Sequence, residues 1–202
     1  LITHSHYDHF VPEELDIRTA YCVAEVSYGF TVYGTDKVEA ALGNRVHDQK
    51  FLERVGFSLI EPFTPFTAAG YRITPLAADH DAESGPVIFL IEKDGKTLLY
   101  GNDTGYFPTD TWRYFETIRP KLDLAVFDCT FGNRPGMRNN HMNIQTVIEV
   151  RDRLKETGCI CADTKNYLHH ICHNSWTTHD EFSEIAAPYG FTVTYDGLEA
   201  EI

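Results

Sequence analysis

The segment that decides the fold lies at the start of the chain, where residues 3–9 read Thr-His-Ser-His-Tyr-Asp-His. The imidazoles of His4, His6 and His9 and the carboxylate of Asp8 fall within this short segment. In an extended backbone His4 and His6 project to the same side, because side chains alternate along a strand. Two imidazoles on one side can hold one metal ion, and after a turn Asp8 and His9 can face a second. Histidine and carboxylate suit zinc, manganese or iron, so this segment predicts a metal site rather than a solvated polar loop.

The composition agrees with a folded domain and limits the classes of partner. The 202 residues include 43% hydrophobic residues, which is enough for a sizeable core. The formal charge of −13 weighs against binding an extended nucleic acid, which needs clustered lysine and arginine. A small phosphorylated substrate held by local cations remains compatible with that charge. No apolar run reaches the length of a membrane span, so no membrane partner is expected.

Cysteine usage indicates the compartment. The chain has five cysteines at irregular spacing, Cys22, Cys129, Cys159, Cys161 and Cys172. An odd count in a chain of this length does not resemble a disulfide framework. We therefore expect a reducing, cytoplasmic setting.

Turn signals divide the chain into short strands and helices without a linker or an internal repeat. Strands are expected over residues 30–33, 71–77, 87–92, 97–100 and 122–127, and helices over residues 36–42, 143–156 and 179–187. Gly43 and Gly158 are expected to end the first two helices, and Thr178 with Glu181 resembles a capping box for the third. Asp196-Gly197 predicts a hairpin in addition to the one at residues 93–96. The mixture predicts a layered α/β fold.

Three further candidate ligands follow predicted strands. His80 ends the stretch LAADH, Asp103 lies in YGNDTG, and His170 lies in LHHICHN. Together with the first segment, this order resembles the His-x-His-x-Asp-His signature and downstream ligands of the metallo-β-lactamase-fold hydrolases. The resemblance implies an αββα sandwich, in which two mixed sheets pack face to face between outer helices.

The resemblance also assigns the ligands of two divalent ions. It implies that His4, His6, His80 and Asp103 hold one ion. It implies that Asp8, His9 and His170 hold the other, with Asp103 shared, and Asp8 is also taken as a catalytic residue. Two such ions can bind one hydroxide between them and lower its pKa toward neutrality.

Later motifs are similar to those of the phosphodiesterases of the carbon–phosphorus lyase pathway, which open a cyclic phosphate on ribose. They are residues 123–132 (DLAVFDCTFG), 140–143 (NHMN), 170–173 (HICH) and 195–199 (YDGLE). The resemblance implies that His141 lies beside the substrate and protonates the leaving group. The alternative is that His141 is a surface histidine that caps the helix after it.

The chain departs from this subgroup in ways that leave two points open. The subgroup carries a cysteine cluster before the first motif, which forms a structural zinc site with the counterpart of His173. Here only Leu1–Thr3 precede the motif, so His173 is either a zinc ligand without visible partners or a donor that contacts His170. Because the chain also lacks an initiating Met, we expect a single domain over residues 1–202 whose N-terminal strands are missing.

The sequence therefore predicts a dinuclear metal-dependent phosphodiesterase. A metal-bridging hydroxide is expected to attack phosphorus in a small phosphate ester, with cyclic esters included. The alternatives are a hydrolase of lactones or thioesters with the same fold, an endonuclease that processes tRNA, and, least supported, a metal-binding protein without activity. A homodimer is considered as the assembly.

Overall fold

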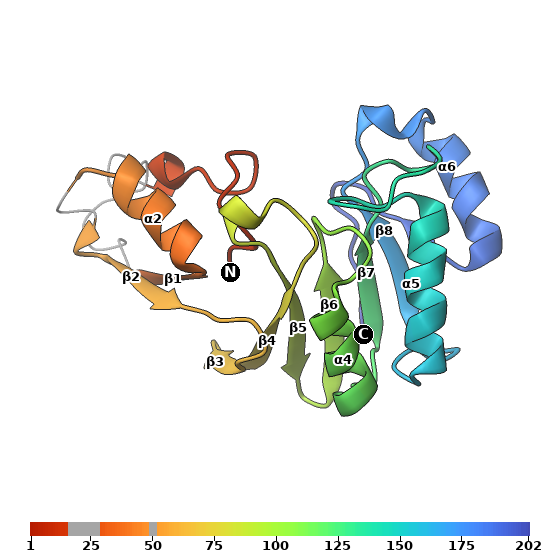
Figure 1. Ribbon diagram of the computed structural model, residues 1–202, viewed down its shortest axis with the longest axis horizontal. Coiled ribbons are helices and arrows are strands. Elements are labelled where there is room, and N and C mark those ends of the chain that lie inside the picture. The colour runs from red at the N-terminus through yellow and green to blue at the C-terminus, as the bar shows by residue number, and fades with distance from the viewer. Residues whose placement is uncertain (16–28, 49–51) are drawn as a thin grey trace. The chain divides into compact units, whose positions relative to one another are not determined.

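The computed structural model describes residues 1–15, 29–48 and 52–202, so Cys22 lies outside the described part. Strands and helices alternate along the chain (Figure 1), which confirms the α/β prediction. The strands are β1 (Phe30–Gly34), β2 (Val55–Leu59), β3 (Phe66–Ala68), β4 (Tyr71–Ala77), β5 (Val87–Lys93), β6 (Lys96–Gly101), β7 (Leu124–Asp128), β8 (Lys165–His169) and β9 (Thr192–Val193). The helices are α2 (Asp36–Arg45), α4 (Thr109–Ile118), α5 (Ile144–Glu156) and α6 (His179–Ala186), with 3-10 turns η2 (Ala82–Ser84), η3 (His173–Ser175) and η4 (Ala187–Tyr189).

The described chain divides into two compact units. Unit 1 comprises Leu1–Glu61 and Asp81–Val87, and unit 2 comprises Pro62–His80 and Ile88–Ile202. That residues 1–202 form a single domain stays a prediction.

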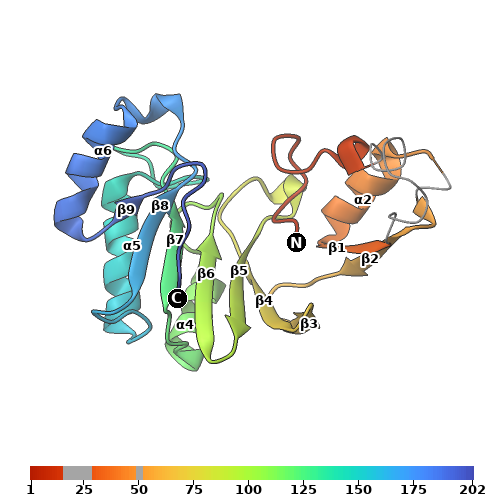
Figure 2. The same cartoon turned by 180° about the vertical axis from the view of Figure 1, so that it is seen from behind.

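Unit 2 is built on a mixed sheet with the strand order β3-β4-β5-β6-β7-β8-β9. The pairs β3·β4 and β5·β6 are antiparallel. The pairs β6·β7, β7·β8 and β8·β9 are parallel, so the carboxyl ends of β6, β7 and β8 reach the same edge of the sheet. Figure 2 shows the strands of this sheet with α4 behind them.

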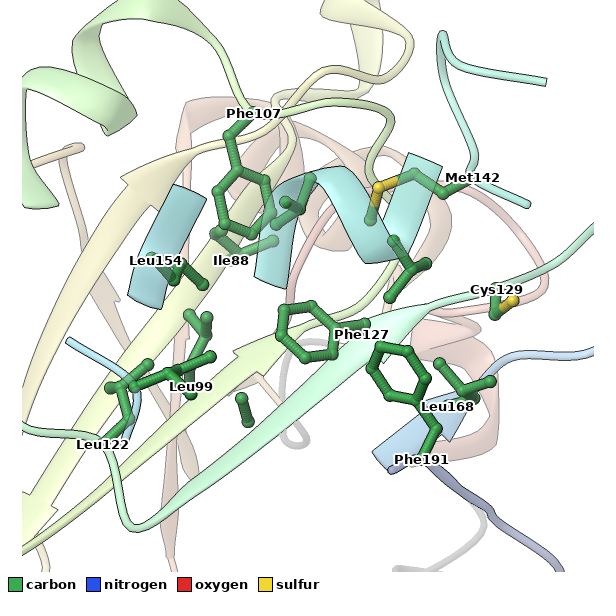
Figure 3. Packing of buried hydrophobic residues seen from close by; sticks show 14 of the residues in the cluster. Ile88, Leu99, Phe107, Leu122, Phe127, Cys129, Met142, Leu154, Leu168 and Phe191 are labelled. Atoms are coloured by element: carbon green, nitrogen blue, oxygen red, sulfur yellow. The ribbon is translucent and has the colours of Figure 1, made fainter. Parts of the chain in front are cut away.

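The core of unit 2 forms where α4 and α5 pack on the sheet. Helix α5 buries Ile144, Val147, Val150 and Leu154, which recur at the helical period and face the strands. Leu99, Phe127 and Leu168 of three adjacent strands meet this face, as Figure 3 shows, and all are fully buried. The side chain of Asn143 caps α5 by accepting a hydrogen bond from Thr146 N.

Unit 1 joins a parallel pair of strands, β1 and β2, to helix α2. Its buried cluster contains Phe10, Val32, Val38, Leu42 and Val46. The start of the chain is tied into this unit by backbone hydrogen bonds, from Ile2 N to Tyr33 O (2.9 Å), Ser5 N to Ser84 O (3.0 Å) and Val87 N to Thr3 O (2.9 Å). The histidine segment is thus fixed between β1 and the turn η2.

Most predicted elements are confirmed, including the hairpin of β5 and β6, the stop at Gly158 and the capping box at Thr178. The prediction for Gly43 is wrong, because α2 continues to Arg45. Gly43 adopts no left-handed conformation, and Val46 N closes the helix on Leu42 O.

The predicted hairpin at Asp196-Gly197 is also wrong. A turn does form there, with Leu198 N donating to Tyr195 O, but no strand follows it within the described residues. Strand β9 instead pairs in parallel with β8 after the crossover through α6. Strand β9 is only two residues long, so it has few backbone groups with which a returning antiparallel strand could pair. None of the helices in the described ranges has the length and apolar character that a membrane crossing requires.

Candidate metal centre

Four side chains that follow β6, β7 and β8 lie close together in unit 2. They are Asp103 after β6, Asp128 at the end of β7, His170 after β8, and His141 in the loop before α5. One donor atom from each lies within 4.8 Å of the others. The parallel arrangement of β6, β7 and β8 brings these residues together, because the carboxyl ends of parallel strands share one edge.

Asp103 is buried, at 2% exposure, and its backbone lies in the left-handed region at a φ of 50°. A residue other than glycine holds this conformation at a cost, and such residues cluster at functional sites. Its neighbour Asn102 donates from Nδ2 to Asp103 Oδ2 at 3.4 Å. Asn102 Oδ1 is buried and accepts no hydrogen bond from the part of the chain that the structure describes. Sequence reasoning found Asp103 and missed Asn102.

Asp128 is fully buried, and sequence reasoning did not single it out. Its Oδ1 accepts hydrogen bonds from Met142 N (3.0 Å) and Thr130 N (3.1 Å), which fix the orientation of the carboxylate. Its Oδ2 lies 2.9 Å from His141 Nδ1. The signal available in the sequence was an aspartate that directly follows the apolar run 124–127 and precedes a turn.

Thr130 links the histidines to this carboxylate. Its hydroxyl donates to Asp128 and lies 2.8 Å from His170 Nδ1 and 3.1 Å from His141 Nδ1. The rings of His141 and His170 stack with centroids 5.6 Å apart. The hydroxyl of Thr130 thus contacts Nδ1 of both imidazoles and helps to orient the two rings.

His80 lies in the same unit, beside His141, with the two ring centroids 4.9 Å apart. Its Nδ1 donates to the carbonyl oxygen of Asn140 at 3.2 Å. Histidines that ligate metals commonly donate their other ring nitrogen to a backbone carbonyl, which fixes the tautomer. The contact with Asn140 O fixes the orientation of the His80 ring in the same way.

The histidines of unit 1 also converge. His4 is buried, its Nε2 lies 3.1 Å from His6 Nδ1, and its ring centroid lies 4.5 Å from that of His9. His6 Nε2 lies 3.0 Å from the carboxylate of Asp81, a partner that the sequence did not indicate. The alternating projection expected for His4 and His6 is consistent with this proximity.

Two of the predicted site residues, Asp8 and His173, belong to none of the groups of potential metal ligands in the described part of the chain. The side chain of Asp8 is 74% exposed, and it pairs with His9 at 3.6 Å. His173 begins the exposed turn η3, and within the described ranges it joins no cluster of potential ligands. Its role as a zinc ligand or as a donor to His170 stays a prediction.

Burial and the nearby carboxylates shift the pKa values of three side chains around the centre. Burial raises the pKa of Tyr100, and the Asp103 carboxylate raises it further. Burial raises the pKa of the Cys129 thiol, and Asp128 adds to the shift, so this buried cysteine stays neutral. Burial also lowers the pKa of His169, a β8 residue whose Nδ1 lies 2.8 Å from Thr194 Oγ1.

The residues of unit 2 fit a divalent metal. The buried carboxylates of Asp103 and Asp128 lie 2.9–3.7 Å from the Nδ1 atoms of His141 and His170. Buried carboxylates are costly unless they are paired or coordinate a cation. Oxygen and imidazole donors together suit zinc, manganese or iron.

Comparison with known proteins establishes the class. The chain belongs to the beta-lactamase superfamily, because the family model described as "Beta-lactamase superfamily domain" matches residues 1–171. The chain accordingly has the metallo-beta-lactamase fold, a fold of metal-dependent hydrolases, as the sequence predicted. No curated protein matches the sequence.

Solved structures share this fold at low identity. The metallo-beta-lactamase fold protein YhfI from Bacillus subtilis is 16% identical with a TM-score of 0.69, over 97% of this chain and 74% of that one. A diphosphatase from the PhnP family is 19% identical with a TM-score of 0.69, over 97% and 67%. Zinc-bound PqqB from Methylobacterium extorquens is 18% identical with a TM-score of 0.69, over 99% and 71%. At these identities the likeness shows the fold alone.

Gly105 gives a prediction about how the centre is supported. A Cβ at this position would lie 2.5 Å from the carbonyl oxygen of Arg138 and 2.8 Å from Asn139 Cα. We expect Gly105→Ala to push the loop before His141 outward and to lower the free energy of unfolding by about 1–3 kcal/mol. Thermal unfolding checks this value. The control is Gly43→Ala on helix α2, where a Cβ meets nothing within 4 Å and stability should not fall. If Gly105→Ala and Gly43→Ala have equal free energies of unfolding, the prediction is contradicted.

Proposed function

We propose that this protein is a dinuclear metal-dependent phosphodiesterase that acts on a small phosphate ester, with a cyclic ribose phosphate as the first candidate. One observation carries the proposal: the imidazole of His141 is held by the buried carboxylate of Asp128, next to Asp103 and His170. This is a proton donor of fixed orientation placed beside ligands that suit a metal ion. The similarity of residues 123–132, 140–143, 170–173 and 195–199 to phosphodiesterase motifs supports the substrate class.

The proposed ligands follow the order of the family motifs. We assign His4, His6, His80 and Asp103 to one ion and Asp8, His9 and His170, with Asp103 shared, to the other. Zinc, manganese and iron all suit these donors. When bound, two such ions would lower the pKa of a water molecule and offset the negative charge of the phosphate.

The side chains of the protein would then bind, orient and transfer a proton. Asp128 Oδ2 accepts from His141 Nδ1, which fixes the ring, and the same oxygen accepts from the Thr130 hydroxyl. A proton at His141 Nε2 can pass to the departing ester oxygen as the bond to phosphorus breaks. Asp8 is retained as a proposed ligand and catalytic residue.

Charge and composition support a small substrate. A protein with a formal charge of −13 repels the backbone of an extended nucleic acid, whereas a small anion needs only local compensation. A diphosphatase of the PhnP family is among the solved structures with this fold, which supports a substrate that contains phosphorus. The cysteine pattern favours a cytoplasmic setting, and the homodimer stays a prediction.

The test combines metal analysis with a substrate panel on the same sample. The panel contains bis(p-nitrophenyl) phosphate, a cyclic ribose phosphate, a lactone and a thioester. We expect bound divalent metal, and the largest kcat/KM for a phosphodiester that is lost with a chelator and restored by zinc, manganese or iron. A larger kcat/KM for the lactone or thioester would assign the protein to another ester class. Bound metal with no hydrolysis of any ester would indicate a metal-binding protein without activity.

A further inference from the structure

We propose that Phe131, Arg134 and Trp176 form a second binding surface beside the candidate metal centre, which holds the nucleobase of a nucleoside phosphodiester. The proposal rests on the proposed function and names a substrate class for it. We call these three residues the stacking surface. All three lie in unit 2.

In the stacking surface, the guanidinium of Arg134 forms cation–π contacts with the rings of Phe131 and Trp176. The guanidinium carbon of Arg134 lies 5.3 Å from the centroid of the Trp176 ring and 5.7 Å from that of Phe131. Both distances fall within the range of cation–π contacts. Within the described ranges no carboxylate forms an ion pair with Arg134. Its N–H groups therefore remain available for an anion.

Trp176 presents most of its surface to solvent, at 69% exposure. Its backbone is in the left-handed region, at a φ of 64°, which a bulky side chain adopts only when its surroundings hold it there. The indole is exposed although its backbone conformation is energetically unfavourable. This combination indicates that the ring binds a ligand rather than packing in the core. Base stacking on an aromatic side chain is tolerant of sequence and contributes about 1–3 kcal/mol.

Two loops connect the stacking surface to the centre. The loop after β7 carries Phe131 and Arg134 and then His141, and the rings of Phe131 and His141 lie 5.9 Å apart. The loop after β8 carries His170 and then Trp176. Cys172 N donates to Thr130 O at 3.2 Å, which joins the two loops close to their starts.

Glycine at position 132 lets the same loops pack closely. A Cβ on Gly132 would lie 2.5 Å from Ser175 Cβ, and Ser175 is buried directly before Trp176. The position of Trp176 is therefore coupled to the loop that places His141. A ligand part bound on Trp176 would be held at a fixed position relative to the proton donor.

The charges around Trp176 indicate where the phosphate and the base of a substrate would lie. Trp176 borders a cavity of about 420 Å³ that is also lined by Thr177, Glu181, Glu184 and Ile185. Carboxylates repel a phosphate but not an uncharged ring. The phosphate is therefore expected near Arg134, where a guanidinium can donate to its oxygens, and the base against Trp176.

The experiment compares two esters that break the same bond. Thymidine 5′-(p-nitrophenyl phosphate) and methyl p-nitrophenyl phosphate both release p-nitrophenolate, and only the first carries a base. We expect the metal-loaded protein to favour the thymidine ester, and Trp176→Ala to lower the ratio of the two kcat/KM values about tenfold. Trp176→Phe should restore part of the ratio, because it retains a ring. The matched control is Tyr71→Ala, which removes another exposed ring that pairs with a cation, Lys93 at 4.5 Å, and should leave the ratio unchanged.

A binding measurement separates failure of this proposal from failure of the proposed function. The chain has two tryptophans, and Trp112 is buried at 3% exposure, so quenching by thymidine 5′-monophosphate reports Trp176. We expect saturable quenching that is absent from Trp176→Phe. If neither ester is hydrolysed but quenching occurs, the phosphodiesterase assignment fails and the stacking surface stands. If esters are hydrolysed with a ratio that Trp176→Ala does not change, or if quenching is absent, the stacking surface is wrong.

Discussion

Replacing Asp103 with alanine is expected to remove both metal ions and reduce hydrolysis to the background rate. Asp103 is the ligand that we assign to both ions, so its loss removes an anionic donor from each site at once. Asp103 is buried beside Asn102, whose side chain donates to its carboxylate. The measurement is the metal content per chain by mass spectrometry of the purified variant, with phosphodiester hydrolysis on the same sample.

The control for this variant is Asp94→Ala. Asp94 lies in the turn between β5 and β6 with a φ of 51°, close to the 50° of Asp103. Both substitutions therefore place alanine in the left-handed region, and only one removes a proposed ligand. Asp94→Ala should retain its metal and activity. An Asp103→Ala protein that folds and retains two ions per chain would overturn the shared-ligand assignment.

Replacing His141 with alanine should lower kcat by about 10²–10⁴-fold while the metal content stays unchanged. The loss follows from the proton that His141 is proposed to give to the leaving oxygen. It should therefore be largest for an ester that releases an alkoxide. It should be small for an ester that releases p-nitrophenolate, which departs without protonation. Comparing the two leaving groups in the variant measures the proton transfer directly.

Two further variants sharpen this test. Asp128→Asn keeps the shape of the residue that orients His141 but weakens the acceptor, so we expect a smaller loss and an altered pH profile of kcat. His179→Ala removes an exposed histidine from the first turn of α6 and should change neither rate nor metal content. The donor atoms of His141, Asp103, Asp128 and His170 lie within 4.8 Å, so metal loss from His141→Ala would show that His141 is a ligand instead.

The local sequence predicted the elements of this fold well because their signals are local. The helical spacing of Ile144, Val147, Val150 and Leu154 defined α5 before its packing partners were known. The turn at residues 93–96 defined the hairpin of β5 and β6. The predictions at Gly43 and Asp196-Gly197 failed for the same reason. A glycine or a turn sequence permits a helix to end or the chain to reverse, but the packing of the neighbouring elements decides whether it does.

The sequence by itself determined the family motif, the strand ends that carry His80, Asp103 and His170, and the charge that disfavours an extended nucleic acid. Only the tertiary structure showed that Asp128 and Thr130 hold His141, or that Arg134 lies on Trp176. Asp128, Thr130 and His141 lie at the end of β7 and on the loop after it without a regular spacing, whereas Arg134 and Trp176 lie on two loops that follow different strands. Arg134 and Trp176 meet because the parallel strands β7 and β8 end at one edge of the sheet, and their register is set by long-range pairing that no local pattern encodes.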